Sequence, residues 1–329
     1  MKRKDIVNII LFILVFAFAA YRYSTRTYSS QRSAFVMDTL VEIKIETKQK
    51  DTDSILDNAY KLMEDYENKL SFYKTESQIW KFNNSIIDSL LIDEDLDKIL
   101  SIAEELFQKT NSHYDVTIGA LSEIWAFEDE IIPANEEIEK AIKNTGYKKL
   151  NFRNGYLHKP DEMKINLGSL AKGYIIDKTI EYLKQQNVVS GFVNAGGDMR
   201  IFGREKPYKI GIQHPRSESN ELIDIINVGN KSIVTSGDYE RYFIKDGTRY
   251  HHIIDPLTGF PSKDLISVTV IAETALMADA YSTALFLLEP KQAIKLAEET
   301  EGLEAVVYYL RNDKIEKLET LGMKGYYER

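Results

Sequence analysis

Apolar and polar residues follow two different periods along this chain, and the periods predict helices and strands. Residues 41–46 alternate between apolar and polar side chains, which predicts a first strand with one buried face. Residues 51–69 carry apolar side chains at helical spacing, with an aspartate at the start available as a cap. The apolar positions of this helix are Ile55, Leu56, Ala59, Leu62, Met63 and Tyr66. The same spacing predicts further helices over residues 95–109 and 135–143.

The second half of the chain is predicted to hold many short strands and then helices. Residues 148–166 contain short strand-like pieces separated by Arg-Asn-Gly, which is typical of a hairpin turn. Residues 171–186 predict a helix, and residues 189–272 predict short strands separated by Gly, Asn, Asp and Pro. The remaining predicted elements are helices over residues 274–287 and 290–300 and strands over residues 305–310 and 314–318. Because helices and strands are partly segregated, the pattern predicts an α+β fold with mixed or antiparallel sheets flanked by helices.

The N-terminal segment has a composition of its own. A basic cluster at residues 2–4 precedes an apolar segment over residues 6–20, a pattern typical of an export signal. The segment is short for a spanning helix, which needs about 17–25 residues, but the two tyrosines that follow could extend it into an anchor. A helix buried in the core is the alternative. We expect residues 1–21 to be a signal peptide or membrane anchor helix.

The rest of the chain is predicted to act on the outer side of a membrane. Residues 22–33 are polar and predict a linker, which leaves residues 34–329 as the functional domain. Residues 1–33 carry six Lys and Arg side chains and one acid, so the domain carries a formal charge of −14. An acidic domain argues against nucleic acid as a partner. Cysteine is absent, which excludes disulfides, thiolate chemistry and a lipid-modified N-terminal cysteine.

One predicted helix, over residues 275–288, combines a carboxylate and a hydroxyl with otherwise apolar side chains. Asp279 and Thr283 are four residues apart and therefore project from the same helical face. A buried carboxylate is costly, so Asp279 must be paired, hydrogen-bonded or bound to a cation. An exposed polar stripe, or a contact with a neighbouring loop, is the alternative. Carboxylate, hydroxyl and carbonyl oxygens suit Mg²⁺ or Ca²⁺, and a phosphate-bearing substrate favours Mg²⁺.

Glycines mark three places where the backbone could approach a ligand. In INLGSLAKGYIID we expect a strand to end at Asn166 and a helix to follow Gly168, with free amide groups and Lys172 directed towards an anion. Such junctions serve ordinary packing in most proteins, so this one alone is weak support. NAGGD, residues 194–198, and TSGDYERYF, residues 235–243, are turns that could equally lack any further role.

The stretch YHHIIDPLTG, residues 250–259, contains two of the five histidines. Alternation along a strand places His251 and His252 on opposite sides, so only one of them can face a site. An imidazole with an ordinary pKa of about 6.5 is mostly neutral near pH 7 and can accept a proton. A surface or packing histidine is the alternative.

Taken in order, NLGSLAKGY, NAGGD, TSGDYERYF, YHHIIDPLTGFP and ADAYSTALFLL resemble motifs of the ApbE family of FAD:protein FMN transferases. Upstream, FVMDT, SFYKTESQIWKFN and YDVTIGALSEIWAF are similar to family segments. The resemblance extends over roughly residues 35–288. It implies a Mg²⁺-dependent enzyme that splits FAD at its pyrophosphate, releases AMP and leaves FMN esterified to a threonine hydroxyl of a target protein. An FAD pyrophosphatase producing FMN and AMP, and a non-catalytic extracytoplasmic flavin-binding protein, are the alternatives.

The resemblance also implies roles for individual residues. Asp279, Thr283 and Ser169 fall where the family holds Mg²⁺, with Ser169 contributing an oxygen such as its carbonyl. His252 falls where the family's histidine accepts the proton of the incoming threonine. The positions expected to contact flavin or nucleotide are Met37, Tyr73, Tyr114, Asp115, Asn166, Lys172 and Ile254. The expected partners are FAD and a target protein, such as a redox pump subunit or an extracellular electron-transfer flavoprotein.

Two positions depart from the family pattern. Asn166 stands where many relatives have Asp, which removes a negative charge beside the expected site. Met-Asp-Thr at residues 37–39 replaces a more usual Met-Gly-Thr and affects how a flavin would approach that strand. Neither departure alters His252, Asp279 or Thr283, so activity remains the expectation.

Overall fold

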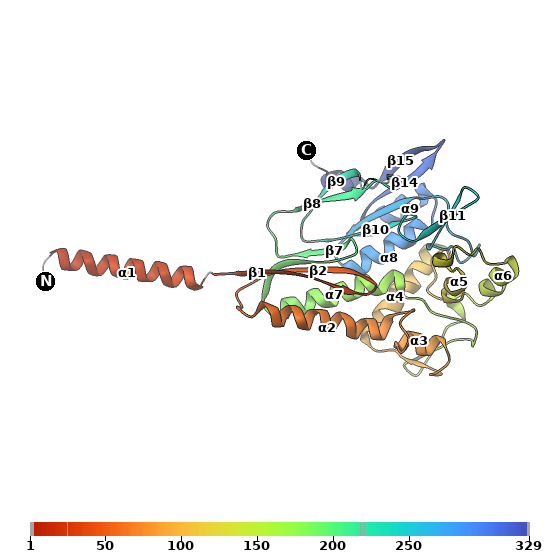
Figure 1. Ribbon diagram of the computed structural model, residues 1–329, viewed down its shortest axis with the longest axis horizontal. Helices are drawn as coiled ribbons and strands as arrows, with labels where there is room; N and C mark the ends of the chain where they lie inside the picture. Colours follow the sequence, from red (N-terminus) through yellow and green to blue (C-terminus); the bar gives the residue numbers. More distant parts are fainter. Residues whose placement is uncertain (1–2, 25, 218, 220, 328–329) are drawn as a thin grey trace.

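The fold is built around an antiparallel sheet with helices packed on one face (Figure 1). The computed structural model describes residues 3–24, 26–217, 219 and 221–327. Within these residues the main sheet has eight strands, and every neighbouring pair is antiparallel. In spatial order they are β1 (Tyr28–Val36), β2 (Thr39–Thr47), β6 (Val188–Ala195), β7 (Asp198–Phe202), β10 (Ser232–Gly237), β13 (Ser267–Ala272), β14 (Glu304–Arg311) and β15 (Lys314–Glu319). The predicted α+β class is confirmed.

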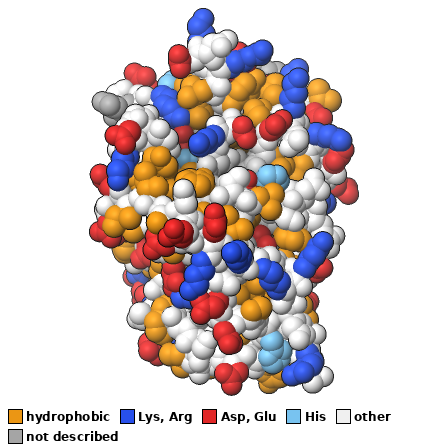
Figure 2. Space-filling view, turned by 90° about the vertical axis from the view of Figure 1, so that its right-hand side faces the viewer, with side chains coloured by type: hydrophobic (Ala, Val, Ile, Leu, Met, Phe, Trp, Pro, Cys, Tyr) orange, Lys and Arg blue, Asp and Glu red, His pale blue; other side chains and the backbone are white. Residues whose placement is uncertain are grey.

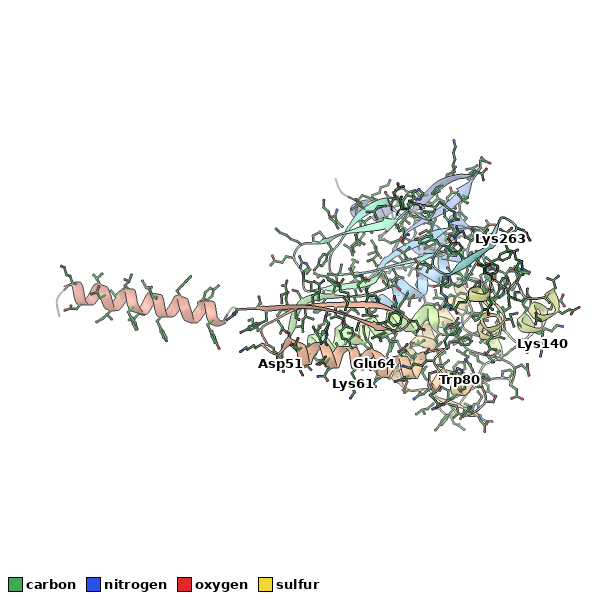
Figure 3. The ribbon with its side chains drawn as sticks, viewed as in Figure 1. Asp51, Lys61, Glu64, Trp80, Lys140 and Lys263 are labelled. Atoms are coloured by element: carbon green, nitrogen blue, oxygen red, sulfur yellow. The ribbon has the colours of Figure 1, made fainter. Side chains whose placement is uncertain are left out.

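The helices predicted from apolar spacing are present, and two short helices over residues 78–83 and 119–124 were not predicted. Those of the main body are α2 (Thr52–Leu70), α3 (Gln78–Asn83), α4 (Glu94–Lys109), α5 (Gly119–Ile124), α6 (Asn135–Lys143), α7 (Gly168–Gln185), α8 (Ala275–Phe286) and α9 (Pro290–Glu298). Asp51 caps α2, and its side chain accepts a hydrogen bond of 3.2 Å from the Ser54 backbone N–H. Lys61 and Glu64 lie exposed on the outer face of α2 (Figure 3). The predicted stripe is therefore the face that α2 turns towards the core.

Short hairpins and turns complete the body. β11 (Tyr242–Lys245) pairs with β12 (Thr248–His251), β8 (Tyr208–Gln213) pairs with β9 (Leu222–Val228), and β5 (Tyr156–His158) lies between β3 (Leu90–Leu91) and β4 (Asn151–Arg153). Single 3₁₀ turns are η1 (Phe127–Asp129), η2 (Tyr147–Lys149) and η3 (Leu321–Gly325). The predicted Arg-Asn-Gly hairpin is the β4–β5 turn, with Asn154 and Gly155 both at positive φ. The strand expected to end at Asn166 is wrong: this segment makes only an isolated bridge between Ile118 and Lys164.

Around β10, β13 and β14, both faces of the main sheet are buried. Neighbouring residues such as Ile233 and Val234, or Val306 and Val307, belong to opposite hydrophobic clusters. One cluster lies between the sheet and α2, α7 and α8, and the other lies beneath the β8–β9 hairpin and η3. β13 is buried along its whole length, and its sequence, SVTVIA, has no charged residue.

The N-terminus differs from the predicted domain boundaries. α1 (Arg3–Ser24) projects away from the body (Figure 1), and residue 2 of the predicted basic cluster lies outside the described residues. Among the residues described, no helix combines the length and apolarity needed to cross a membrane. The predicted linker, residues 22–33, is partly a strand, because β1 begins at Tyr28 and pairs with β2. Its polar side chains suit an edge strand with one solvent face.

The turn between β1 and β2 contains backbone strain. Met37 and Asp38 have φ of 56° and 55°, so both central residues occupy the left-handed region, as in a type I′ hairpin turn. Neither residue has the conformational freedom of glycine. This is where the chain departs from the Met-Gly-Thr pattern.

Replacing Asp38 with Gly is expected to raise the free energy of unfolding by about 0.5–1 kcal/mol, because glycine adopts positive φ without steric cost. Urea unfolding followed by circular dichroism would measure the change. Ser33→Gly, in the regular part of β1, is the control and should lower the free energy of unfolding. If Asp38→Gly were destabilising, the turn would depend on the aspartate side chain.

The end of the molecule opposite α1 has a mixed surface. Acidic, basic and hydrophobic side chains are interspersed over this face (Figure 2). The β11–β12 hairpin lies at this end, above α5 and α6 (Figure 1).

Candidate active site

One cavity of about 510 Å³ brings together segments from the whole length of the body. The β1–β2 turn, the start of α7, the middle of α8 and the segment that follows β12 all contribute to its walls. Every residue expected to bind metal or ligand, or to act as the base, lines it: Met37, Tyr73, Tyr114, Asp115, Asn166, Ser169, Lys172, His252, Ile254, Asp279 and Thr283. The motifs are therefore separate in sequence but adjacent in space.

Close contact between α7 and α8 places Asp279 in the cavity wall. A Cβ atom at Gly173 would lie 2.3 Å from the carbonyl oxygen of Ala275 and 2.8 Å from the Cβ of Asp279, so only glycine allows this approach. The Gly173 backbone N–H donates a 2.8 Å hydrogen bond to Asp279 Oδ2. This contact gives one oxygen of the buried carboxylate a fixed position.

A second aspartate on α7 fixes the start of α8. Asp177 accepts hydrogen bonds from the backbone N–H groups of Ala275 and Leu276, at 2.8 and 3.0 Å, and forms an ion pair with Arg200. Thr274 caps the same helix through Met277 N, at 3.3 Å. These bonds hold α8 against α7, so the positions of Asp279 and Thr283 do not depend on a flexible loop.

The oxygen atoms on α7 and α8 could hold a hard cation. Asp279 supplies a carboxylate, Thr283 a hydroxyl, and Ser169 begins the turn of α7 that precedes Gly173. The Gly173 N–H, which in a regular helix donates to the Ser169 carbonyl, lies 2.8 Å from Asp279 Oδ2. The Ser169 hydroxyl lies 2.8 Å from the Tyr114 hydroxyl. No cluster of three or more His, Asp or Glu side chains suited to a metal occurs in the described part of the chain.

Lys172 is surrounded by carboxylates. Its Nζ lies 2.6 Å from Asp198 Oδ2, with Asp279 and Glu240 also close. Burial would lower the pKa of Lys172, but these charges outweigh it and raise the pKa, so the ammonium stays charged. Burial raises the pKa of Asp279 to about 7; the Asp198 charge adds to the increase and Lys172 opposes it. When Lys172 and the three carboxylates around it are all ionised, the group has a net charge of two negative units. A divalent cation would neutralise this charge.

The two histidines lie in different environments. His251 is buried, with Nε2 at 2.7 Å from the Ser262 carbonyl oxygen and its ring edge-to-face against Phe286. His252 lines the cavity, and its backbone N–H donates to the Arg241 carbonyl at 3.1 Å. Loss of hydration lowers the pKa of His252, and the nearby positive charges add to this, so its ring is neutral near pH 7. The expectation that only one of the pair faces the site is confirmed.

Hydrogen bonds to oxygen atoms of the turn itself stabilise the turn that follows His252. The Asp255 side chain accepts a 2.9 Å hydrogen bond from the Leu257 backbone N–H. The Asp255 backbone carbonyl accepts a 2.8 Å hydrogen bond from the Gly259 N–H. His113 Nδ1 lies 3.1 Å from Asp255 Oδ2 and joins this turn to the loop before α5. Trp125 Nε1 donates to the Gly259 carbonyl at 2.9 Å. The Asp-Pro-Leu-Thr-Gly turn therefore positions His252 and does not itself supply reactive groups.

Two of the expected ligand-contacting residues use their side chains within the protein. The Asp115 carboxylate accepts hydrogen bonds of 2.8 and 2.7 Å from Thr117 and one of 2.9 Å from Tyr147 N–H. Asn166 Oδ1 accepts from Gly168 N–H at 2.9 Å, and its Nδ2 donates to the Ser122 hydroxyl at 3.1 Å. Both residues line the cavity, but these bonds shape the loops around it. The Asn166 amide supplies a donor that a carboxylate would lack.

Among the cavity residues that sequence reasoning missed are His113, Asp198, Glu240 and Arg241. Asp198 and Glu240 lie inside NAGGD and TSGDYERYF. For Asp198 the available signal was an acid directly after a glycine turn, whereas Glu240 stands three residues after Gly237. His113 precedes Tyr114, and nothing in its local sequence marks it.

Comparisons with known proteins agree with this geometry. The model of the ApbE family matches residues 37–307. An FAD:protein FMN transferase of Buchnera aphidicola is 38% identical over 250 residues, which cover 72% of this chain and 73% of that protein. The Escherichia coli K12 protein of the same name is 33% identical over 249 residues, covering 71% and 70%.

Solved structures show the same fold. The flavin transferase ApbE from Vibrio cholerae superposes with a TM-score of 0.82 at 26% identity, covering 92% of this chain and all (100%) of that one. The ApbE protein from Thermotoga maritima gives a TM-score of 0.81 at 33% identity with the same coverage. With a family match over most of its length and relatives more than 30% identical over more than two thirds of it, the chain belongs to the ApbE family.

Proposed function

We propose that this protein is a Mg²⁺-dependent FAD:protein FMN transferase that joins FMN to a threonine hydroxyl of another protein. The threonine oxygen would bond to the FMN phosphorus, the pyrophosphate bond to the AMP half would break, and AMP would leave with the electron pair of that bond. FAD and the threonine hydroxyl would thus become a phosphoester-linked FMN and AMP. The names of the relatives support this activity.

The observation that carries the proposal is the joint position of His252, Asp279 and Thr283 on one cavity. Asp279, Thr283 and the Ser169 carbonyl are hard oxygen donors that fit Mg²⁺, and waters and substrate phosphates would complete its shell. When bound, Mg²⁺ would neutralise charge on the phosphates of FAD. The neutral ring of His252 is free to accept the threonine proton, and bound phosphates would raise its pKa towards the ordinary value.

Other residues would position the dinucleotide. Tyr73 is half exposed at the cavity and offers a flat ring for a flavin to stack on, while Met37 and Ile254 add apolar wall. Lys172 would place its charge near the phosphates from the first turns of α7. The backbone N–H groups at the start of α7 favour the same negative ligand.

Incubating the purified protein with FAD, Mg²⁺ and a candidate acceptor tests the function. A mass increase of the acceptor corresponding to one FMN, with AMP released in equal amount, is the expected result. Free FMN and AMP without a modified acceptor would indicate a pyrophosphatase. Intact FAD would indicate a flavin-binding protein without catalysis.

We also propose that the protein acts outside the cell membrane, with α1 as its signal or anchor. The apolar side chains of α1 are exposed, for example Phe12 at 72% and Phe16 at 68%, and need cover from lipid or from an export receptor. A redox pump subunit or an extracellular electron-transfer flavoprotein would then be an accessible acceptor. N-terminal sequencing of the protein recovered from cell envelopes distinguishes an anchor that is retained from a signal that is removed.

A further inference from the structure

The cavity walls carry far more negative than positive charge. Six carboxylates line it: Asp38, Glu67, Asp115, Asp198, Glu240 and Asp279. Among the described residues that line it, Lys172 and Arg241 are the Lys and Arg side chains. FAD brings further negative charge in its pyrophosphate, so without a bound metal ion its binding favours a cationic side chain that is not already neutralised by the protein.

Lys172 does not meet this requirement by itself. Its ammonium is 2.6 Å from Asp198, and Asp279 and Glu240 are its next charged neighbours. Its charge is already balanced within the cavity wall. A phosphate that pairs with Lys172 competes with Asp198 and Asp279, which are both buried, and Asp279 is also held by the Gly173 N–H.

Arg241 is different because its backbone is fixed while its guanidinium is weakly held. The Arg241 carbonyl accepts the backbone N–H of His252 at 3.1 Å, which places the two residues side by side. The guanidinium lies over the ring of Tyr73, 5.6 Å from its centroid. Its carboxylate neighbour is Glu128, whose Oε1 is 3.8 Å away, too far for a hydrogen bond.

These contacts stabilise the observed position of the guanidinium only slightly. The Arg241 side chain is 51% exposed and that of Glu128 is 90% exposed, and exposed ion pairs of this kind contribute little. An exposed cation–π contact is likewise weak. A guanidinium that pairs with a phosphate makes two parallel charge-assisted hydrogen bonds, which are considerably stronger.

We propose that Arg241 binds a phosphate group of FAD, moving its guanidinium from the ring of Tyr73 to the phosphate while its backbone keeps His252 in place. This inference rests on the proposed function, because FAD is taken as the ligand. The movement uncovers Tyr73, so one residue links phosphate binding to exposure of the ring on which the flavin would stack. The Arg241 charge also acts on His252, where it lowers the pKa and favours the neutral ring.

The test compares a flavin that carries phosphates with one that does not. FAD carries the pyrophosphate and adenosine, whereas riboflavin carries only the flavin ring and its ribityl chain. Their dissociation constants would be measured without Mg²⁺, by isothermal titration calorimetry, for the wild type, Arg241→Ala and Arg241→Lys. We expect Arg241→Ala to weaken FAD binding roughly 10- to 100-fold and to leave riboflavin binding within about twofold. Arg241→Lys should recover part of the FAD affinity, because it keeps the charge but loses the paired geometry.

Arg204→Ala is the matched control. Arg204 also stacks on a tyrosine, 4.3 Å from the Tyr208 ring centroid, but lies outside the cavity lining. It removes the same charge and should leave both affinities unchanged. The thermal midpoint of each variant shows whether it folds as the wild type does.

Two results would overturn the inference. Equal weakening of FAD and riboflavin would mean that Arg241 acts through packing against Tyr73. Unchanged affinity of Arg241→Ala for both flavins would mean that Arg241 binds no phosphate. The same conclusion would hold if the variant only needed a higher acceptor concentration for transfer. The proposed function fails separately: a wild type that binds FAD but modifies no acceptor would disprove transfer and leave the role of Arg241 intact.

Discussion

Replacing Asp279 with Asn is expected to lower the rate of FMN transfer roughly 10³-fold, because the variant loses the carboxylate that would hold Mg²⁺. Asparagine has nearly the same size, and its carbonyl oxygen can still accept the Gly173 N–H, so the α7–α8 contact should survive. The rate is measured by mass spectrometry of the acceptor at saturating FAD. A rate close to that of the wild type would place the metal elsewhere.

The effect of pH on Mg²⁺ binding gives a second readout for the same variant. The pKa of Asp279 is raised to about 7, so between its ordinary value and that pH the folded metal-free protein retains a proton that the unfolded chain releases. The stability contributed by this proton is present at low pH and is lost as the pH rises through about 7. Mg²⁺ binds the ionised form, so it should raise the thermal midpoint more at pH 8 than at pH 6. Asp279→Asn should abolish this difference.

The hydroxyl on the next turn of α8 supplies a matched pair of controls. Thr283→Ser keeps an oxygen at the expected metal position, whereas Thr283→Val keeps the shape and removes the oxygen. The serine variant should retain most of the Mg²⁺-dependent stabilisation, and the valine variant should lose it. Equal behaviour of the two would exclude the hydroxyl as a metal ligand.

Replacing His252 with Ala is expected to reduce FMN transfer roughly 10²- to 10⁴-fold, the usual contribution of a general base. FAD binding should change little, because the ring is neutral in the free protein and its loss removes no charge from the cavity. Transfer and FAD affinity are therefore measured separately, the first by acceptor mass and the second by calorimetry.

His158→Ala is the control for the loss of a histidine, since His158 lies on β5 and outside the cavity lining. It should leave both quantities unchanged. Added imidazole that partly restores transfer in His252→Ala would show that the missing group is a base. Undiminished transfer in His252→Ala would remove this residue from the mechanism.

Most elements of the fold could be predicted because burial on one face imposes a local period. β2 buries Val41, Ile43 and Ile45 completely and alternates as expected. β1 could not be found in this way: it is an edge strand whose alternate side chains are exposed, and its residues have the composition of a linker. Its partner β2 and the contact of its Arg32 carbonyl with the Tyr60 hydroxyl, at 2.6 Å, are tertiary features.

The sequence motifs predict which residues belong to the site. They do not predict the contacts between segments that are far apart in the sequence. The ordered motifs locate Asp279 and His252, whereas the bond from Gly173 to Asp279 depends on how closely two helices pack. The ion pair between Lys172 and Asp198 joins α7 to β7 and leaves no mark in either local sequence. Local sequence patterns therefore do not predict ion pairs between distant segments.

Strand β1 has a consequence for how far the protein can reach. Its nine residues, at about 3.3 Å each, extend roughly 30 Å, and all of them pair with β2. A disordered tether would let the distance between α1 and the cavity vary. A paired strand instead gives β1 a fixed length between α1 and the turn at the cavity. Under the proposed function, we expect an acceptor to present its threonine at about this distance from the surface that holds α1, and proteins that present it much lower to escape modification.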